Sequence, residues 1–230
     1  MTLPHTQTIK LGAVELAYHE RGDAGSPALL LLHGLGSSSS TWGAVAESFA
    51  DTHRVLSLDL RGHGRSTWTS TYLVDDMADD VAGFLDMLGV TGVSVIAHSM
   101  GAMVAYVLAE RWPDRVGRLL LEDPPPPVPA TPPRVSGERP AGELDYDWRI
   151  QDDFSRQRNA PPSRWQERLT DIRAATLIIR GSRSHIPAAA VEQMAARIPH
   201  CRVVALDAGH DVHEDAPDEF LHHATAFMAV

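Results

Sequence analysis

The sequence has little of three things: cysteine, long apolar runs and positive charge. Cys201 is the only cysteine among 230 residues, which excludes an intramolecular disulfide and suits a reducing compartment. It falls at the start of an expected strand, and we interpret it as an inert buried thiol. No apolar run approaches the roughly 20 residues that span a bilayer. Residues 1–10 are polar, unlike a secretory signal. We therefore expect a cytoplasmic protein.

Acidic residues outnumber basic ones, and the formal net charge is −10 at pH 7. Nucleic acid and anionic membranes repel such a chain, so we expect neither as a partner. The length of 230 residues, of which 43% are hydrophobic, suits one soluble globular core. The sequence leaves the oligomeric state open.

Short apolar runs alternate with helical patterns along most of the chain. We expect strands at residues 7–11, 14–20, 28–32, 55–59, 93–97, 118–122, 176–180 and 202–206. Helices are expected at residues 42–49, 72–88, 102–111, 188–198 and 218–228. Most of the later strands are continuously apolar, as in parallel strands that are buried on both faces. The order predicts a doubly wound α/β sheet whose first two strands form an antiparallel edge.

The sequence Ala-His-Ser-Met-Gly at 97–101 lies between an apolar run and a helical pattern. A strand, a sharp turn with one serine and a helix form the layout of a nucleophile elbow. Small residues are needed two positions to either side of the serine, because strand and helix backbones nearly touch there. Gly101 meets this need fully and Ala97 less completely. The alternative is an ordinary turn that holds a buried Ser99.

Three further segments follow expected strands. The glycine turn at residues 33–36 would let backbone N–H groups point into a cavity, as an oxyanion requires, although a plain turn is the alternative. The run at residues 59–66 has a mostly architectural role in our interpretation. The turn at 207–213 carries His210, which can lean over the sheet edge toward a serine at the elbow.

These four segments, in this order, resemble the α/β-hydrolase superfamily from Val14 to Met228. The resemblance implies a mostly parallel, twisted sheet of about eight strands, with helices on both faces and a short proline-rich cap. It also implies that Ser99 is the nucleophile and His210 the general base. The backbone N–H groups of Leu35 and Met100 would form the oxyanion hole.

Alternation breaks between residues 124 and 171, and residues 124–140 hold half of the sixteen prolines. The superfamily inserts its cap at this place. We therefore expect a core domain of residues 1–123 and 172–230 and a cap of residues 124–171. Aromatic residues there would form the pocket roof or, equally, anchor a loop to the core: Tyr146, Trp148, Phe154 and Trp165.

The acid of a Ser-His-acid triad is missing from its usual place. No Asp or Glu occurs at 172–191, and Ser184 and His185 stand where the resemblance predicts an aspartate. Some members carry the acid after the preceding strand, where Asp123 and its neighbour Glu122 lie. Alternation points these two side chains opposite ways, so only one faces His210. We favour Asp123 and keep Glu122 as the alternative.

Other residues near these motifs are candidate substrate contacts. We expect them to be His33, Gly34, His98, Tyr146, Trp148 and His185. His185 is alternatively a surface residue or a structural partner of Asp123. We expect no cofactor and no metal. A zinc site built from His210, Asp211 and His213 lacks a well-spaced further ligand set.

The resemblance favours a serine hydrolase. It would cleave a carboxylic ester, lactone or thioester of a small, apolar substrate through an acyl-enzyme on Ser99. A serine at the elbow argues against epoxide hydrolase or haloalkane dehalogenase chemistry, which proceeds through an alkyl-enzyme ester on an aspartate. The alternatives are a cofactor-independent oxygenase, a C–C bond hydrolase and a ligand receptor with little turnover.

Overall fold

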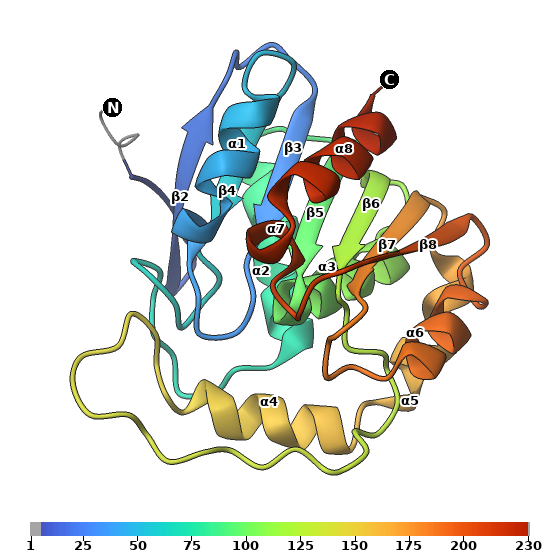
Figure 1. Ribbon diagram of the computed structural model, residues 1–230. Coiled ribbons are helices and arrows are strands. Elements are labelled where there is room, and N and C mark those ends of the chain that lie inside the picture. Colours follow the sequence, from blue (N-terminus) through green and yellow to red (C-terminus); the bar gives the residue numbers. More distant parts are fainter. Residues whose placement is uncertain (1–5, 230) are drawn as a thin grey trace.

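An eight-stranded sheet crosses the molecule in the computed structural model, which describes residues 6–229 (Figure 1). The expectation for residues 1–10 therefore falls partly on residues 1–5, outside the described range. The strands are β1 (Gln7–Leu11), β2 (Val14–Arg21), β3 (Ala28–Leu32), β4 (Arg54–Leu58), β5 (Val93–His98), β6 (Val116–Glu122), β7 (Ala175–Gly181) and β8 (Cys201–Leu206). Their order is β1-β2-β4-β3-β5-β6-β7-β8. The pairs β1·β2 and β2·β4 are antiparallel and the others parallel, as predicted.

Helices cover both faces of the sheet (Figure 1). They are η1 (Ser39–Trp42), α1 (Gly43–Phe49), α2 (Val74–Met87), α3 (Ser99–Arg111), α4 (Ile150–Asn159), α5 (Ser163–Glu167), η2 (Arg168–Asp171), α6 (Ala188–Ala195), α7 (Val212–Asp215) and α8 (Pro217–Met228). Helices α2, α3 and α6 pack in one core layer, and α1 and α8 pack in the other. The fold is thus the three-layer α/β arrangement that the alternation predicted.

Strand β3 explains why the parallel strands are continuously apolar. Its leucines alternate between the two core layers: Leu30 and Leu32 face α2 and α3, whereas Leu29 and Leu31 face α1 and α8. All four side chains are fully buried. A strand covered on both sides needs apolar residues at every position, which hides the usual two-residue period.

The expected strands are confirmed to within two residues, but the helical segments η1, α4, α5, η2 and α7 were not predicted. Helix α3 starts at Ser99 rather than 102, because the elbow residue is itself the first helical residue. Helices α4, α5 and η2 lie in the segment expected to be irregular. In α4 only Ile150 and Phe154 are large apolar residues, so the helix carries little apolar periodicity to detect.

Helix α4 lies beyond the carboxyl ends of the parallel strands, with the proline-rich segment passing outside it (Figure 1). This places residues 124–159 over the sheet edge where β5 and β6 end. The division into core and cap at 123/124 and 171/172 stays a prediction.

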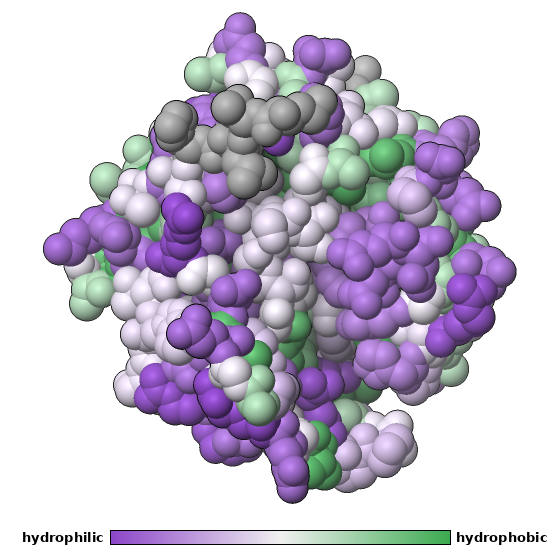
Figure 2. Space-filling model, turned by 60° about the vertical axis from the view of Figure 1, so that its left-hand side comes forward, coloured by the Kyte–Doolittle hydropathy of each residue, from purple (hydrophilic) through white to green (hydrophobic). Residues whose placement is uncertain are grey.

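The face shown in Figure 2 is mostly hydrophilic, with hydrophobic side chains in small separate patches. Among residues 6–229, no helix is both long enough and apolar enough to cross a bilayer.

Candidate active site

Ser99 stands at the tip of a sharp turn between β5 and α3. Its φ of 51° lies in the left-handed region, which costs a non-glycine residue on the order of 1–2 kcal/mol. Two residues on, a Cβ at Gly101 would lie 2.5 Å from the carbonyl oxygen of His33 and 2.6 Å from that of Leu32. Strand β3 and helix α3 therefore approach so closely that only glycine fits at 101. The turn has the nucleophile-elbow geometry.

His210 connects Ser99 to a carboxylate. Its Nε2 lies 2.8 Å from Ser99 Oγ, and its Nδ1 lies 2.6 Å from Asp123 Oδ2. A carboxylate only accepts, so Nδ1 carries the proton and Nε2 is free to accept the Ser99 proton. The structure thus brings Ser99, His210 and Asp123 into one hydrogen-bonded chain, the arrangement of a nucleophile, a base and an orienting acid.

Asp123 is held from the neighbouring strand. Its Oδ1 accepts the backbone N–H of Gly181 at 3.2 Å, and its Oδ2 accepts the Ser184 hydroxyl. Ser184 Oγ in turn accepts the N–H of Ile186 at 3.1 Å. Because β6 and β7 are adjacent, the end of one strand meets the turn after the other. Ser184 stands where the resemblance predicts the acid, and its hydroxyl donates to Asp123, which follows the neighbouring strand β6. We did not predict this contact.

Glu122 points the other way and serves another histidine. Its carboxylate accepts the backbone N–H of His213 at 2.8 Å and His213 Nδ1–H at 2.8 and 2.9 Å. The His213 ring stacks on Trp42, with centroids 4.4 Å apart. Burial lowers the pKa of His213, but the hydrogen bond and charge of Glu122 outweigh it and raise the pKa overall. Of the two candidate acids, Asp123 contacts His210 and Glu122 does not.

The two backbone N–H groups expected to bind an oxyanion lie just after two adjacent strands, β3 and β5. Leu35 follows β3, and Met100 is the second residue of α3. The first-turn N–H groups of a helix have no intrahelical partner, so the Met100 N–H is free for a ligand. A Cβ at Gly34 would lie 3.4 Å from the Ser99 Cβ and 2.7 Å from His98 Nδ1. The 33–36 turn therefore packs directly against the elbow.

Two neutral histidines brace this turn. His33 Nε2 accepts the N–H of Leu60 at 3.0 Å, and His63 Nε2 accepts the N–H of Gly36 at 3.1 Å. Each Nδ1 faces a carbonyl oxygen. Burial lowers the pKa of both rings, that of His63 to about 3. The His33 side chain is fully buried and does not line the cavity at Ser99, so its contact with substrate stays a prediction. In this structure His33 supports the turn.

This neutral state predicts acid sensitivity. The unfolded His63 takes up a proton below a pKa of about 6.5, while the folded ring stays neutral until about 3. The stability contributed by the neutral His63 is therefore fully present above pH 6.5 and is lost as the pH falls below that value. Between pH 7 and 5, proton uptake by the unfolded His63 alone should lower the free energy of unfolding by about 2 kcal/mol. Urea denaturation at both pH values measures the loss.

A His63→Gln variant is the control for this prediction. Glutamine has no proton to take up, so its loss between pH 7 and 5 should be smaller than the wild-type loss by about 2 kcal/mol. An identical pH dependence in both proteins would contradict the neutral, buried state of His63.

His98 was also expected to contact substrate, which stays a prediction; in the structure it hydrogen-bonds to the backbone of His210. The side chain is buried, and its Nε2–H donates to the carbonyl oxygen of His210 at 3.1 Å. Burial lowers the pKa of His98 to about 4. A neutral His98 behind the catalytic candidate therefore fixes the backbone of His210. His185, in contrast, lies edge-on to the His210 ring with centroids 4.7 Å apart and lines the cavity.

The expected aromatic roof is only partly present. Phe154 lines the cavity, but Tyr146 stacks on His63, and Trp148 lies beside Tyr146. Trp165 is buried elsewhere, with its Nε1–H donating to Asp75 on α2. Gly34, Tyr146 and Trp148 are not among the residues that line the cavity, and their contact with substrate stays a prediction. They shape the turn and the cap.

A cavity of about 800 Å³ opens at Ser99 and His210. Leu35 and His185 line it from the core, and the proline-rich segment and α4 line it from the other side. The volume suits a small molecule. Within residues 6–229, no three His, Cys, Asp or Glu side chains converge as a metal site would require. The zinc alternative fails because His210 faces Asp123 while His213 faces Glu122.

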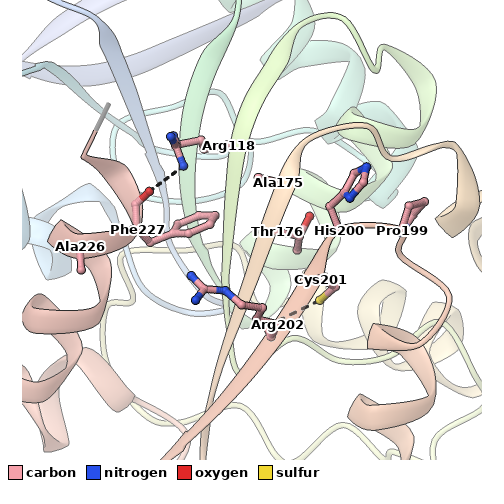
Figure 3. A pocket seen from close by; sticks show the side chains of 9 residues that line it. All are labelled: Arg118, Ala175, Thr176, Pro199, His200, Cys201, Arg202, Ala226 and Phe227. Atoms are coloured by element: carbon pink, nitrogen blue, oxygen red, sulfur yellow. Dashed lines mark hydrogen bonds between the residues drawn. The ribbon is translucent and has the colours of Figure 1, made fainter.

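A second hollow of about 390 Å³ lies at the other end of the strands (Figure 3). Cys201, the first residue of β8, lines it together with Arg118 and Phe227. Burial raises the pKa of the Cys201 thiol to about 12, which leaves it protonated and unreactive at neutral pH. The hollow is separated from Ser99 by the length of the strands, so it serves no step at the elbow.

Comparison with known proteins agrees with this geometry. The family described as alpha/beta hydrolase fold matches residues 27–161, which is more than half of the chain. Epoxide hydrolase 4 of Mus musculus is 32% identical over 116 residues, covering 49% of this chain and 32% of that protein. The sn-1-specific diacylglycerol lipase ABHD11 of Mus musculus is 36% identical over 104 residues, covering 44% and 34%. These alignments span about a third of the relatives' own length.

Solved structures match over nearly the whole chain. A hydrolase from Pseudomonas aeruginosa PA01 superposes with a TM-score of 0.84 at 23% identity, covering 98% of both chains. The enol-lactonase from Burkholderia xenovorans LB400 has a TM-score of 0.84 at 20% identity, covering 96% of this chain and 99% of that one. At such identities the likeness concerns the fold. Together with the family match, it makes this chain a member of the alpha/beta hydrolase family.

Proposed function

We propose that this chain is a serine hydrolase that cleaves a carboxylic ester, lactone or thioester of a small molecule through an acyl-enzyme on Ser99. One observation carries the proposal: the hydrogen-bonded chain from Ser99 Oγ through His210 to Asp123, with 2.8 and 2.6 Å at its two links. The cavity that opens on Ser99 and His210 supports it.

The mechanism follows from these contacts. His210 Nε2 takes the Ser99 proton as Ser99 Oγ attacks the substrate carbonyl, and the N–H groups of Leu35 and Met100 stabilise the oxyanion. His210 returns the proton to the alcohol or thiol as its bond to the carbonyl carbon breaks. The alcohol of an ester or the thiol of a thioester departs, whereas the alcohol of a lactone stays attached to the acyl group on Ser99. Water then gives its proton to His210 and attacks the acyl-enzyme, and His210 returns that proton to Ser99 Oγ as the acid is released. Asp123 stabilises the imidazolium throughout.

The names of these relatives imply different chemistries. Epoxide hydrolase 4 acts on epoxides by its name, whereas the diacylglycerol lipase and the enol-lactonase act on esters and lactones by theirs. A serine nucleophile favours acyl transfer over epoxide opening, which the superfamily resemblance assigns to an aspartate. The ester and lactone chemistry named for the diacylglycerol lipase and the enol-lactonase therefore agrees better with the proposed serine nucleophile than epoxide opening does.

A fluorophosphonate probe tests the proposal directly. It should label the wild-type chain and not a Ser99→Ala variant, and the variant should lose turnover across a panel of 4-nitrophenyl esters and lactones. Circular dichroism would verify that both proteins are folded. Oxygen consumption that survives Ser99→Ala would instead favour the oxygenase, and ligand binding without any product would favour the receptor.

A further inference from the structure

The cavity at Ser99 is positively charged in a chain whose net charge is −10. Two arginines, Arg134 and Arg158, are among its lining residues, and within the described part of the chain no Asp or Glu lines it. The carboxylates thus gather elsewhere on the molecule. A cavity with two cations and no acid is suited to a negatively charged ligand.

Arg134 lacks a carboxylate partner among residues 6–229. Its Nη2–H donates to the neutral Gln151 Oε1 at 3.2 Å, and its Nε is buried with no hydrogen-bond partner. The guanidinium lies 5.3 Å from the centre of the Phe154 ring. A buried donor without a partner costs free energy unless a ligand satisfies it.

Hydrogen bonds from Asn159 and Gln151 hold Arg134 in place without a ligand. Asn159, which ends α4, accepts the backbone N–H of Arg134 at 2.6 Å and donates to its carbonyl oxygen at 2.8 Å. Gln151 Nε2–H donates to the Tyr146 hydroxyl at 3.3 Å, which turns Gln151 Oε1 toward Arg134. A glutamine here orients the cation without neutralising it. Such preorganisation is typical of a binding group rather than of a surface side chain.

Arg158 differs from its neighbour on the same helix. Arg156, two residues earlier, forms an ion pair with Asp153. Arg158 instead donates one Nη1–H to the carbonyl oxygen of Pro126 at 2.6 Å. A guanidinium has five N–H donors, so this contact leaves donors for a ligand. Arg158 directly precedes Asn159, whose side chain bonds the backbone of Arg134, and both arginines line the same cavity.

We propose that Arg134 and Arg158 bind a carboxylate of the substrate, so that the ester or lactone cleaved at Ser99 carries a free carboxylate group elsewhere. Paired guanidinium groups match the planar, two-oxygen geometry of a carboxylate. The inference rests on the proposed function for the bond that is cleaved. It replaces the expectation of an apolar substrate with that of an anionic one.

Two esters that differ by one methyl group test the proposal. 4-Nitrophenyl hydrogen adipate carries a free carboxylate, and methyl 4-nitrophenyl adipate is its neutral counterpart. The wild-type kcat/KM should be at least about 10-fold higher for the charged ester. In Arg134→Gln and Arg158→Gln, the ratio of charged to neutral kcat/KM should fall about 10- to 100-fold. The exposed Arg156→Gln is the matched control and should keep the wild-type ratio.

Failure of the inference is distinguishable from failure of the proposed function. A wild-type ratio near one, or a ratio unchanged in both arginine variants, would overturn the carboxylate site while ester hydrolysis stands. If neither ester is cleaved, calorimetric titration with adipate decides the question of the site. Binding that is lost in Arg134→Gln and kept in Arg156→Gln would support the anion site, and no binding to the wild type would overturn it.

Discussion

Asp123→Asn is expected to lower kcat about 10⁴-fold while the protein stays folded. The asparagine Oδ1 can still accept the Gly181 N–H, so the local structure is kept. Its NH₂ group then faces His210 Nδ1 and favours the tautomer with the proton on Nε2. That proton points at Ser99 Oγ, so His210 can no longer accept the serine proton.

Nitrophenyl ester hydrolysis measures this loss, and Glu122→Gln is the control. Glu122 does not contact His210, so Glu122→Gln should retain most of kcat. Full activity in Asp123→Asn together with loss of activity in Glu122→Gln, at unchanged stability, would show that the acid is wrongly assigned. Adding Ser184→Asp to Asp123→Asn should recover part of kcat, because the Ser184 side chain already reaches the Asp123 oxygen that His210 contacts.

Glu122→Ala is expected to lower the free energy of unfolding by about 3–5 kcal/mol. Glu122 is fully buried and neutralises His213, and removing one partner of such a pair leaves the other buried and unpaired. For a chain of this size, the loss corresponds to a decrease in Tm of roughly 6–20 °C. Thermal unfolding followed by circular dichroism measures it.

The milder Glu122→Gln keeps this prediction testable if Glu122→Ala does not fold. Glu122 raises the pKa of His213 above its unfolded value of about 6.5, so the pair's stabilisation is complete below 6.5. It is lost as the pH rises through the higher folded pKa. Glu122→Gln should therefore lose more stability, relative to wild type, at pH 6 than at pH 9. Equal losses at both pH values would contradict a charged His213.

The adjacent acids show where sequence reasoning stops. Alternation along a strand predicts that Glu122 and Asp123 face opposite ways, and they do. It does not predict which one meets His210, because that depends on the direction in which the strand leaves the sheet. Asp123 has a φ of 41°, which turns the chain at the strand end and presents its carboxylate to His210.

The side of the cavity formed by α4 and the proline-rich segment was even harder to predict from the sequence. Helix α4 has few apolar residues, and the segment before it is rich in proline, so neither has a periodic signal. Arg134 and Arg158 are 24 positions apart in sequence and line one cavity because Asn159 ties the proline-rich segment to the helix. Their shared cavity is a consequence of packing.

The sequence alone determined the α/β fold, the elbow at Ser99 and the turn that carries His210. These follow from local rules: continuous apolar strands, a glycine where two backbones touch, and the order of the segments. The tertiary structure decided which carboxylate reaches His210, that His33 and His98 hydrogen-bond to backbone groups, and that two arginines line one cavity. Those outcomes depend on side chains from distant segments meeting in space, and no local pattern in the chain encodes such meetings.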